Sequence, residues 1–157
     1  MPAAARLTDI TIHGSPFVPG TGSPNVLVGN LPALRAVSPA AAANFVALCA
    51  QILVNAQKLA AAITSSNAPA ALEATNNLKN QVPEAMNMIA SMDKITCPML
   101  LLRIGGPPHG MGVMLGGSST VMINNMPAGR VGDTIQEILS LDPNFVVVGL
   151  PTVQIGG

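Results

Sequence analysis

Hydrophobic and polar positions follow one shared pattern in three short segments of the chain. The segments are residues 22–29 (GSPNVLVG), 117–124 (GSSTVMIN) and 149–156 (GLPTVQIG). Each begins with turn-forming residues and continues with two apolar residues spaced two apart, which places both on one face of a strand. These apolar pairs are Val26 with Val28, Val121 with Ile123, and Val153 with Ile155. The pattern therefore predicts three related, short β segments.

A second element, a short run that ends in arginine, also occurs three times. The copies are Ala4-Ala5-Arg6, Ala33-Leu34-Arg35 and Ala128-Gly129-Arg130, and Pro2, Pro32 and Pro127 precede them. Because the two elements alternate along the chain, they predict three related lobes around a pseudo-threefold axis. We expect each arginine to brace a turn through backbone carbonyls or a carboxylate such as Asp9 or Asp133, and not to act in catalysis.

The regular spacing is interrupted once, between the first and second copies. Ser118 and Leu150 are 32 residues apart, whereas Ser23 and Ser118 are 95 apart, so about 63 residues are inserted. The insertion contains no glycine and is rich in alanine, asparagine and glutamine. We therefore divide the chain into a β unit, residues 1–37 and 95–157, and an insertion, residues 38–94.

Within the insertion, apolar residues recur every three or four positions, which is typical of amphipathic helices. Ser38 followed by Pro39 is a typical helix start, and the first helix should end near Thr64. The second should begin near Pro69, with a kink or restart at Pro83. The predicted apolar stripes are Phe45, Leu48, Ile52, Ala56, Leu59 and Ile63, then Leu72, Thr75, Leu78, Val82, Ala85, Ile89 and Met92. Two helices of about 25 residues joined at residues 65–67 predict an antiparallel hairpin, in which Cys49 is a small core residue.

Composition and charge narrow the class of function. The chain is 49% hydrophobic, but it has no Trp or Tyr and has 15 Gly and 14 Pro, which favours a tightly wound fold of small side chains. Seven basic and seven acidic residues cancel, so we expect no binding of nucleic acid. High hydropathy with little charge suggests a surface covered by a partner. Residues 1–9 have no signal-peptide pattern, so we expect synthesis in the cytoplasm.

The chain has two histidines, both next to glycine: His13-Gly14 and His109-Gly110. With Cys97, they are candidate zinc ligands, and such a site would stabilise a fold with few large apolar residues. The alternative is two histidines on surface turns and a buried thiol. A disulfide between Cys49 and Cys97 is not expected in a chain without a leader.

Residues 117–133 (GSSTVMINNMPAGRVGD) closely resemble the signature of PAAR-repeat proteins. The start, MPAAARLTDITIHG, the end, GLPTVQIGG, and residues 23–37 are similar to the family's other motifs, so the resemblance covers about 95 of 157 residues. It implies a mainly β fold, a small pseudo-threefold cone of short strands with the helical hairpin inserted. It also implies a zinc ion near the apex, held by histidines and a cysteine. His13, Cys97 and His109 stand in matching contexts, and Glu137 stands where the family often has a cysteine, as a fourth ligand or a solvated turn residue.

By this resemblance, the chain is a non-enzymatic tip protein of a type VI secretion system, contractile phage tail or related contractile injection system. One copy would cap and sharpen a trimeric VgrG-like spike, aid membrane puncture, meet the membrane only transiently and leave the cell with the spike. The strand residues Val26, Val28, Val121, Ile123, Val153 and Ile155 would face either the spike or the cone core. An effector cargo docked on the hairpin is a further hypothesis.

The insertion has Glu73, Glu84 and Asp93 as its acids and no histidine, a poor set for acid–base catalysis. We also expect no toxin domain after the last repeat. The alternative function is a metal-stabilised β domain with a membrane-interacting hairpin, which would serve as an adaptor or chaperone-like effector carrier. It is motivated by residues 36–57, which carry no charge and are long enough to span a bilayer, although Asn44, Gln51, Asn55 and Gln57 interrupt them.

Overall fold

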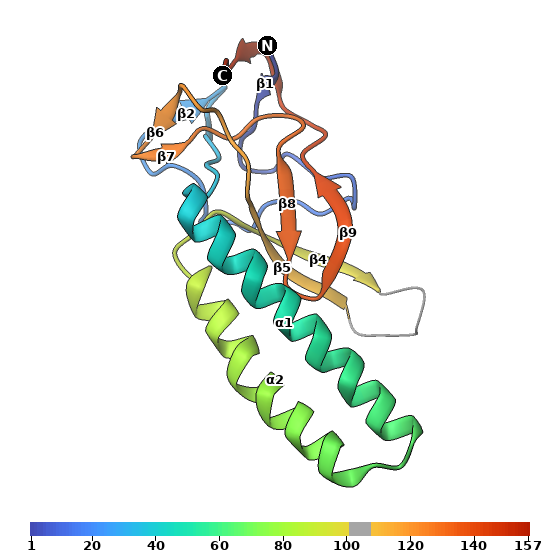
Figure 1. The fold of residues 1–157 in the computed structure, drawn as a ribbon. Helices are drawn as coiled ribbons and strands as arrows, with labels where there is room; N and C mark the ends of the chain where they lie inside the picture. The colour runs from blue at the N-terminus through green and yellow to red at the C-terminus, as the bar shows by residue number, and fades with distance from the viewer. Residues whose placement is uncertain (101–107) are drawn as a thin grey trace.

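The computed structural model describes residues 1–100 and 108–157; the remaining residues of the predicted β unit, 101–107, lie outside this description. The described residues form two helices and ten strands (Figure 1). In chain order these are β1 (Ala3–Ala4), β2 (Leu27–Val28), β3 (Leu31–Pro32), α1 (Pro39–Thr64), α2 (Ala68–Met88), β4 (Lys94–Leu100), β5 (Pro108–Met114), β6 (Met122–Ile123), β7 (Met126–Pro127), β8 (Thr134–Glu137), β9 (Ser140–Phe145) and β10 (Leu150–Gln154).

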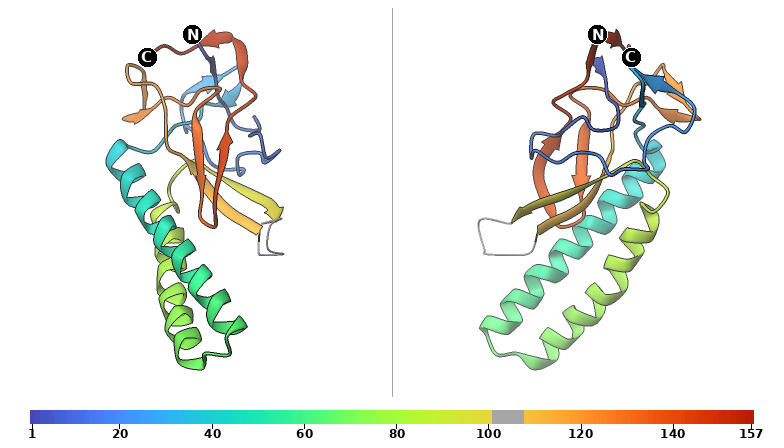
Figure 2. Two further views of the ribbon diagram at one scale, coloured as in Figure 1. Left: turned by 45° about the vertical axis from the view of Figure 1, so that its right-hand side comes forward. Right: turned by 180° about the vertical axis from the view of Figure 1, so that it is seen from behind.

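The strands form several small antiparallel sheets and the helices form a long hairpin. The largest sheet has the order β4-β5-β8-β9, and the pairs β2-β3, β6-β7 and β1-β10 form two-stranded sheets. The helical hairpin extends well beyond the strands at one end, whereas both chain termini lie at the opposite end (Figures 1 and 2). The predicted hairpin is therefore confirmed, but "mainly β" is wrong. The described residues form a mixed α/β fold, because the helices span 26 and 21 residues and the described strands have at most 7.

Three segments of the β unit bond to one another in cyclic order through their backbones. The amide of Ala5 donates to the carbonyl of Gly129, that of Gly129 to Leu34, and that of Leu34 back to Ala5, at 2.9, 2.8 and 3.0 Å. A second cycle is displaced by two residues: Leu7 donates to Pro32, Ala36 to Pro127, and Val131 to Ala3. Each arginine-containing repeat therefore pairs with both of the others, so all three are held together around a common centre.

Each segment follows a tight two-stranded unit. The β2-β3 and β6-β7 turns have positive φ at both central residues, Gly29-Asn30 and Asn124-Asn125, as tight hairpins with the right twist require. The third unit, β1-β10, is assembled from the two ends of the chain. The three tight units surround the apolar cluster of Ala4, Val28, Ala33, Ile123, Ala128 and Ile155, against which Leu150 packs.

The arginines brace turns, as predicted. The amide of Arg6 donates to Asp9 at 2.9 Å and that of Arg130 to Asp133 at 2.7 Å. The amide of Arg35 makes the same bond at 2.8 Å, but its partner is Asp93, 58 positions along the chain instead of 3. The guanidinium groups of Arg35 and Arg130 also donate to the carbonyls of Gly22 and Gly117. In the second copy the helical hairpin therefore lies between Arg35 and Asp93, whereas two residues separate the arginine from the aspartate in the other copies.

The start of α1 follows the predicted signals. Ser38 is the N-cap, its side chain accepts a hydrogen bond from the amide of Ala41, and Pro39 is the first helical residue. A core of residues from both helices and the β unit anchors the near end of the hairpin: Val37, Phe45, Leu48, Cys49, Ile52, Ala85, Ile89, Val113 and Ile138. Farther out, the helices are joined by polar contacts, including Asn55 Nδ2 to Gln81 Oε1 at 2.9 Å.

Of the kink or restart expected at Pro83, the restart does not occur, because α2 continues through Pro83 to Met88; Ala85 and Ile89 beyond it are buried in the core. One feature of the hairpin differs from the prediction. Ile63 and Leu72 belong to the predicted stripes but are exposed. They lie near the outer end of the hairpin, where periodicity is kept but no described element covers the helices.

The paired strand residues of the three repeats do not share one face. Val28, Ile123 and Ile155 are buried in the cluster below the tight units, whereas Val26, Val121 and Val153 are each 36–37% exposed. In the first two copies a serine side chain, Ser23 or Ser118, accepts from the amide of the exposed valine, so that residue still belongs to a turn. In these two copies turn geometry overrides the strand alternation, and of the six paired residues only the three valines are exposed.

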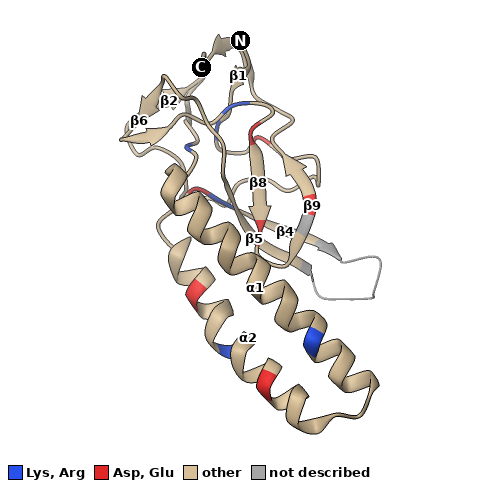
Figure 3. Ribbon diagram, in the orientation of Figure 1, with Lys and Arg blue, Asp and Glu red and all other residues tan. Residues whose placement is uncertain are grey.

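Charges are sparse and scattered (Figure 3). Within the β unit most described charges belong to the arginine–aspartate turns, and the helices carry Lys58, Glu73, Lys79 and Glu84. Burial raises the pKa of Asp9 and Asp133 despite their arginines, and the hydrogen bonds that the Arg35 guanidinium donates to Asp93 raise the pKa of Arg35. By length and composition alone, Pro39–Thr64 is the one described helix that could cross a membrane.

Candidate metal centre

Three side chains of the candidate centre stand at the same place in the three repeats. His13, Cys97 and Glu137 each lie four residues after the aspartate of an arginine–aspartate turn, Asp9, Asp93 or Asp133. The residues midway, Thr11, Ile95 and Ile135, are all buried. In the strands β4 and β8, residues two apart point to the same side, so Cys97 and Glu137 point inward as Ile95 and Ile135 do. His13 instead lies in a turn, which the hydrogen bond from the amide of Gly14 to the carbonyl of Thr11 closes. Each repeat thus delivers one potential ligand to a common point.

The fourth side chain, His109, comes from β5, which lies between two ligand-bearing strands. In β4 Cys97 pairs with Gly110, and in β8 Glu137 pairs with Gly112. His109 therefore lies beside both ligands. Gly110 follows it with φ +83°, a conformation that side chains other than glycine rarely adopt, and the imidazole is buried.

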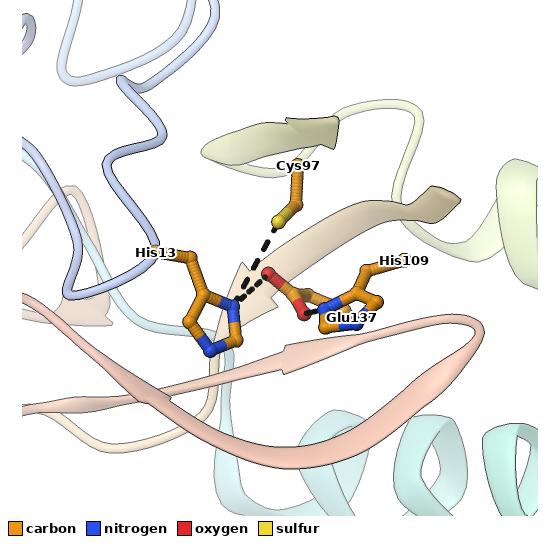
Figure 4. Close-up of side chains that lie close together, drawn as sticks. All are labelled: His13, Cys97, His109 and Glu137. Carbon is orange, nitrogen blue, oxygen red and sulfur yellow. Dashed lines mark hydrogen bonds and ion pairs between the residues drawn. The ribbon is translucent and has the colours of Figure 1, made fainter. Parts of the chain in front are cut away.

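The four side chains converge (Figure 4). His13 Nδ1 lies 3.1 Å from Glu137 Oε1 and 3.7 Å from Cys97 Sγ, and His109 Nδ1 lies 2.8 Å from Glu137 Oε2. One potential ligand atom from each residue can be chosen so that all four lie within 4.8 Å of one another. Four donors around a tetrahedral zinc ion lie roughly 3.3–3.8 Å apart. Small side-chain adjustments would bring the four donors to that spacing.

Burial favours a metal as the partner of this cluster. Cys97, His109 and Glu137 are buried and His13 is partly buried. Two imidazoles, a thiol and a carboxylate are donors that suit zinc, and together they would complete a four-coordinate site. Catalytic zinc sites keep a position open for water, whereas sites with four protein ligands are structural. The donor set therefore fits a structural zinc ion, which would tie the three repeats and β5 together.

Two polar residues flank the cluster. Asn144 Nδ2 donates to Glu137 Oε1 at 2.7 Å, and the exposed carboxylate of Asp142 lies 3.8 Å from His109 Nε2. Neither was identified from sequence. For Asn144 the available signal is its place on β9 opposite Ile135, which becomes visible only once the strand register is known.

The structure brings together all four candidate ligands that the sequence analysis named. Glu137 is buried among them, which contradicts the alternative of a solvated turn residue, and His109 is not on the surface. Cys49 lies elsewhere, in the core of the helical hairpin, where burial raises the pKa of its thiol to about 12. The two cysteines do not form a disulfide.

Comparison with known proteins gives no assignment: no protein-family model and no curated protein matches the chain.

Proposed function

We propose that this protein is a PAAR-like spike-tip protein that caps the trimeric, VgrG-like spike of a contractile injection system. The observation that carries the proposal is the cyclic bonding of three repeats, in which Ala5, Leu34 and Gly129 donate to one another in turn. A single chain with three similar sides can present nearly equal contacts to a trimer. The repeats themselves resemble the PAAR signature, and we propose that together they form the cone of that family.

The end of the molecule that carries the tight units is the proposed spike-binding face. There Leu27 and Met122 are 59% and 55% exposed, and Val26, Val121 and Val153 are partly exposed. The valine recurs in all three repeats, whereas the residue that corresponds to Leu27 and Met122 in the third repeat is Gln154, so a trimer could cover the face by contacts of nearly one kind. The unpaired edges of a β-structured spike would be covered at the same time, which suits a cap.

The candidate metal centre supports the other end of the proposed cone. Glu137 is the last residue of β8, and β8 runs away from the chain termini (Figure 1). His13, Cys97, His109 and Glu137 would hold the zinc ion, whose contribution is structural cross-linking. The proposed work is mechanical, and no residue is assigned a catalytic role.

Mixing the purified protein with the trimeric spike protein of its own system tests the proposal. Light scattering of the complex should give one copy per trimer, and metal analysis should give one zinc ion per copy. Leu27→Glu and Met122→Glu should abolish binding, since each places a charge in the proposed interface. Leu72→Glu is the matched control, because Leu72 is similarly exposed but lies on α2. Failure of the wild-type protein to bind, or equal loss with the control, would contradict the proposal.

A second candidate function, a membrane-interacting hairpin on a metal-stabilised β domain, has one observation in its favour. The most apolar 18-residue window of α1 has a mean hydropathy of 1.5, and only 28% of that window is buried. Flotation with liposomes separates the two functions. Binding to liposomes without binding to the spike would favour the second, whereas a protein that stays with the soluble fraction and binds the spike would favour the first.

A further inference from the structure

Asn144 is a buried polar residue that belongs to the metal centre without being one of its ligands. It lies on β9 opposite Ile135 of β8, and Glu137 is two residues farther along β8 on the same face. Both side chains are 1% exposed, and Asn144 Nδ2 lies 2.7 Å from Glu137 Oε1. An ionised carboxylate only accepts hydrogen bonds, so the amide nitrogen must be the group that faces it.

The amide of Asn144 is held through this bond. Its Oδ1 is buried and has no hydrogen-bond partner among residues 1–100 and 108–157. Buried polar atoms without partners are uncommon, so the side chain is kept in an arrangement that satisfies Glu137 rather than itself.

Glu137 is the ligand that most needs an external support. Its carboxylate is separated from the backbone by more rotatable bonds than the thiol of Cys97 or the ring of His13. In the described structure Glu137 Oε1 also contacts His13 Nδ1, and Oε2 contacts His109 Nδ1. A ring nitrogen that binds a metal ion offers its lone pair to the ion and carries no proton to donate. With metal bound through these nitrogens, Asn144 would remain the donor that fixes Glu137.

We propose that Asn144 is the positioning residue that directs Glu137 toward the metal ion, and thereby sets the affinity of the centre. The proposal rests on the metal site proposed above. Groups that hydrogen-bond to metal ligands typically change metal affinity 10- to 100-fold when they are removed. A purely structural role for Asn144, as a buried link between β8 and β9, would instead lower stability without acting through Glu137.

The test compares full-length variants in competition with a chromophoric chelator for Zn²⁺ and for Co²⁺. Asn144→Leu keeps the number and branching of the side-chain heavy atoms but removes the donor, and should raise the Kd by about 10- to 100-fold. Asn55→Leu is the matched control, because Asn55 is also buried and also donates through Nδ2, to Gln81 in the helical hairpin. The control should leave the Kd unchanged. If Asn144→Leu does not fold, Asn144→Ala, which removes the donor and adds neither charge nor a metal ligand, takes its place.

A double-mutant cycle separates positioning from structure. In a Glu137→Ala background, Asn144→Leu should have no further effect on the Kd, since the residue through which it acts is gone. An equal loss of affinity in both backgrounds, or no loss in either, would overturn the role of Asn144 while leaving the metal site intact. A wild-type protein that binds neither ion would overturn the metal site, and the role of Asn144 with it.

Discussion

Excision of the helical hairpin should leave a folded β unit that still binds metal. The other two turns read Arg6-Leu7-Thr8-Asp9 and Arg130-Val131-Gly132-Asp133, and the third residue has φ +79° at Thr8 and +91° at Gly132. The matching excision removes residues 37–92 and joins Ala36 to Asp93 through one glycine, which adopts positive φ without strain. The amide of Arg35 would then reach Asp93 in the same way as in the intact protein, where the bond is 2.8 Å.

Two opposing effects of similar size decide the stability of the excised chain. Val113 and Ile138 lose the cover of the hairpin, which costs roughly 1.5–3 kcal/mol for each fully buried side chain, or about 3–6 kcal/mol. The entropic cost of closing a loop grows with the logarithm of its length, so a loop of two residues instead of about 57 stabilises the folded state by about 3 kcal/mol. The net change is therefore a loss of about 0–3 kcal/mol, which many domains tolerate.

The assay is urea unfolding followed by circular dichroism, together with the Kd for Zn²⁺ from chelator competition. A companion excision with Val113→Thr and Ile138→Thr controls for aggregation through the uncovered patch. Both chains should unfold cooperatively, and their Kd should match that of the full protein within about threefold, since no candidate ligand is removed. Loss of cooperative unfolding in both, or loss of metal binding in a folded excised chain, would refute the division into two units.

Three further predictions follow from individual contacts. Arg35→Ala should lower the free energy of unfolding in urea by about 3–5 kcal/mol, because it leaves the buried carboxylate of Asp93 without its charged partner; the exposed Lys79→Ala should change it by less than about 0.5 kcal/mol. Cys49, whose pKa is about 12, should resist iodoacetamide at pH 8 and react only in denaturant, and mass spectrometry of the modified peptide would detect any earlier reaction. Free Zn²⁺ at 100 times its Kd should raise the free energy of unfolding of the wild-type protein by about 2.7 kcal/mol and that of His109→Gln by much less; an equal rise in both would mean that zinc acts elsewhere.

Local signals accounted for the three repeats and the helical hairpin, but not for the largest sheet, β4-β5-β8-β9. The repeats identified the three segments that bond in cyclic order, and Ser38 with Pro39 marked the start of α1. These predictions held because caps, turns and periodicity act within a few residues. The exposed positions of Ile63 and Leu72 could not be predicted, since periodicity shows which face of a helix is apolar but not how far a neighbouring element extends.

The residues of the candidate site were predicted from the sequence, but the shared spacing that places three of them was not. His13, Cys97, His109 and Glu137 were named from residue type and resemblance, whereas the structure shows that three of them follow a turn aspartate by four residues. The spacing could be recognised from the sequence at Asp9 and Asp133, since each closely follows its arginine. It could not be recognised at Asp93, because the arginine that pairs with it, Arg35, precedes the whole insertion. Asn144 depends on strand register, which sequence alone does not determine.

The order of features along each repeat suggests why three of the four candidate ligands come from the repeats. Along each repeat the chain first joins the ring of backbone hydrogen bonds, then forms the arginine–aspartate turn, then buries one side chain, and then supplies one candidate ligand. A metal ion bound by these ligands would connect the same three segments that the ring of backbone hydrogen bonds connects. Under a load applied at the metal end, the three segments could then separate neither at the ring nor at the ligands. The fold has no Trp or Tyr, and the core cluster that contains Cys97 and Ile95 has Phe17 as its one aromatic residue. Under the proposed function, a metal ion would therefore add a connection that this core of small side chains supplies only in part.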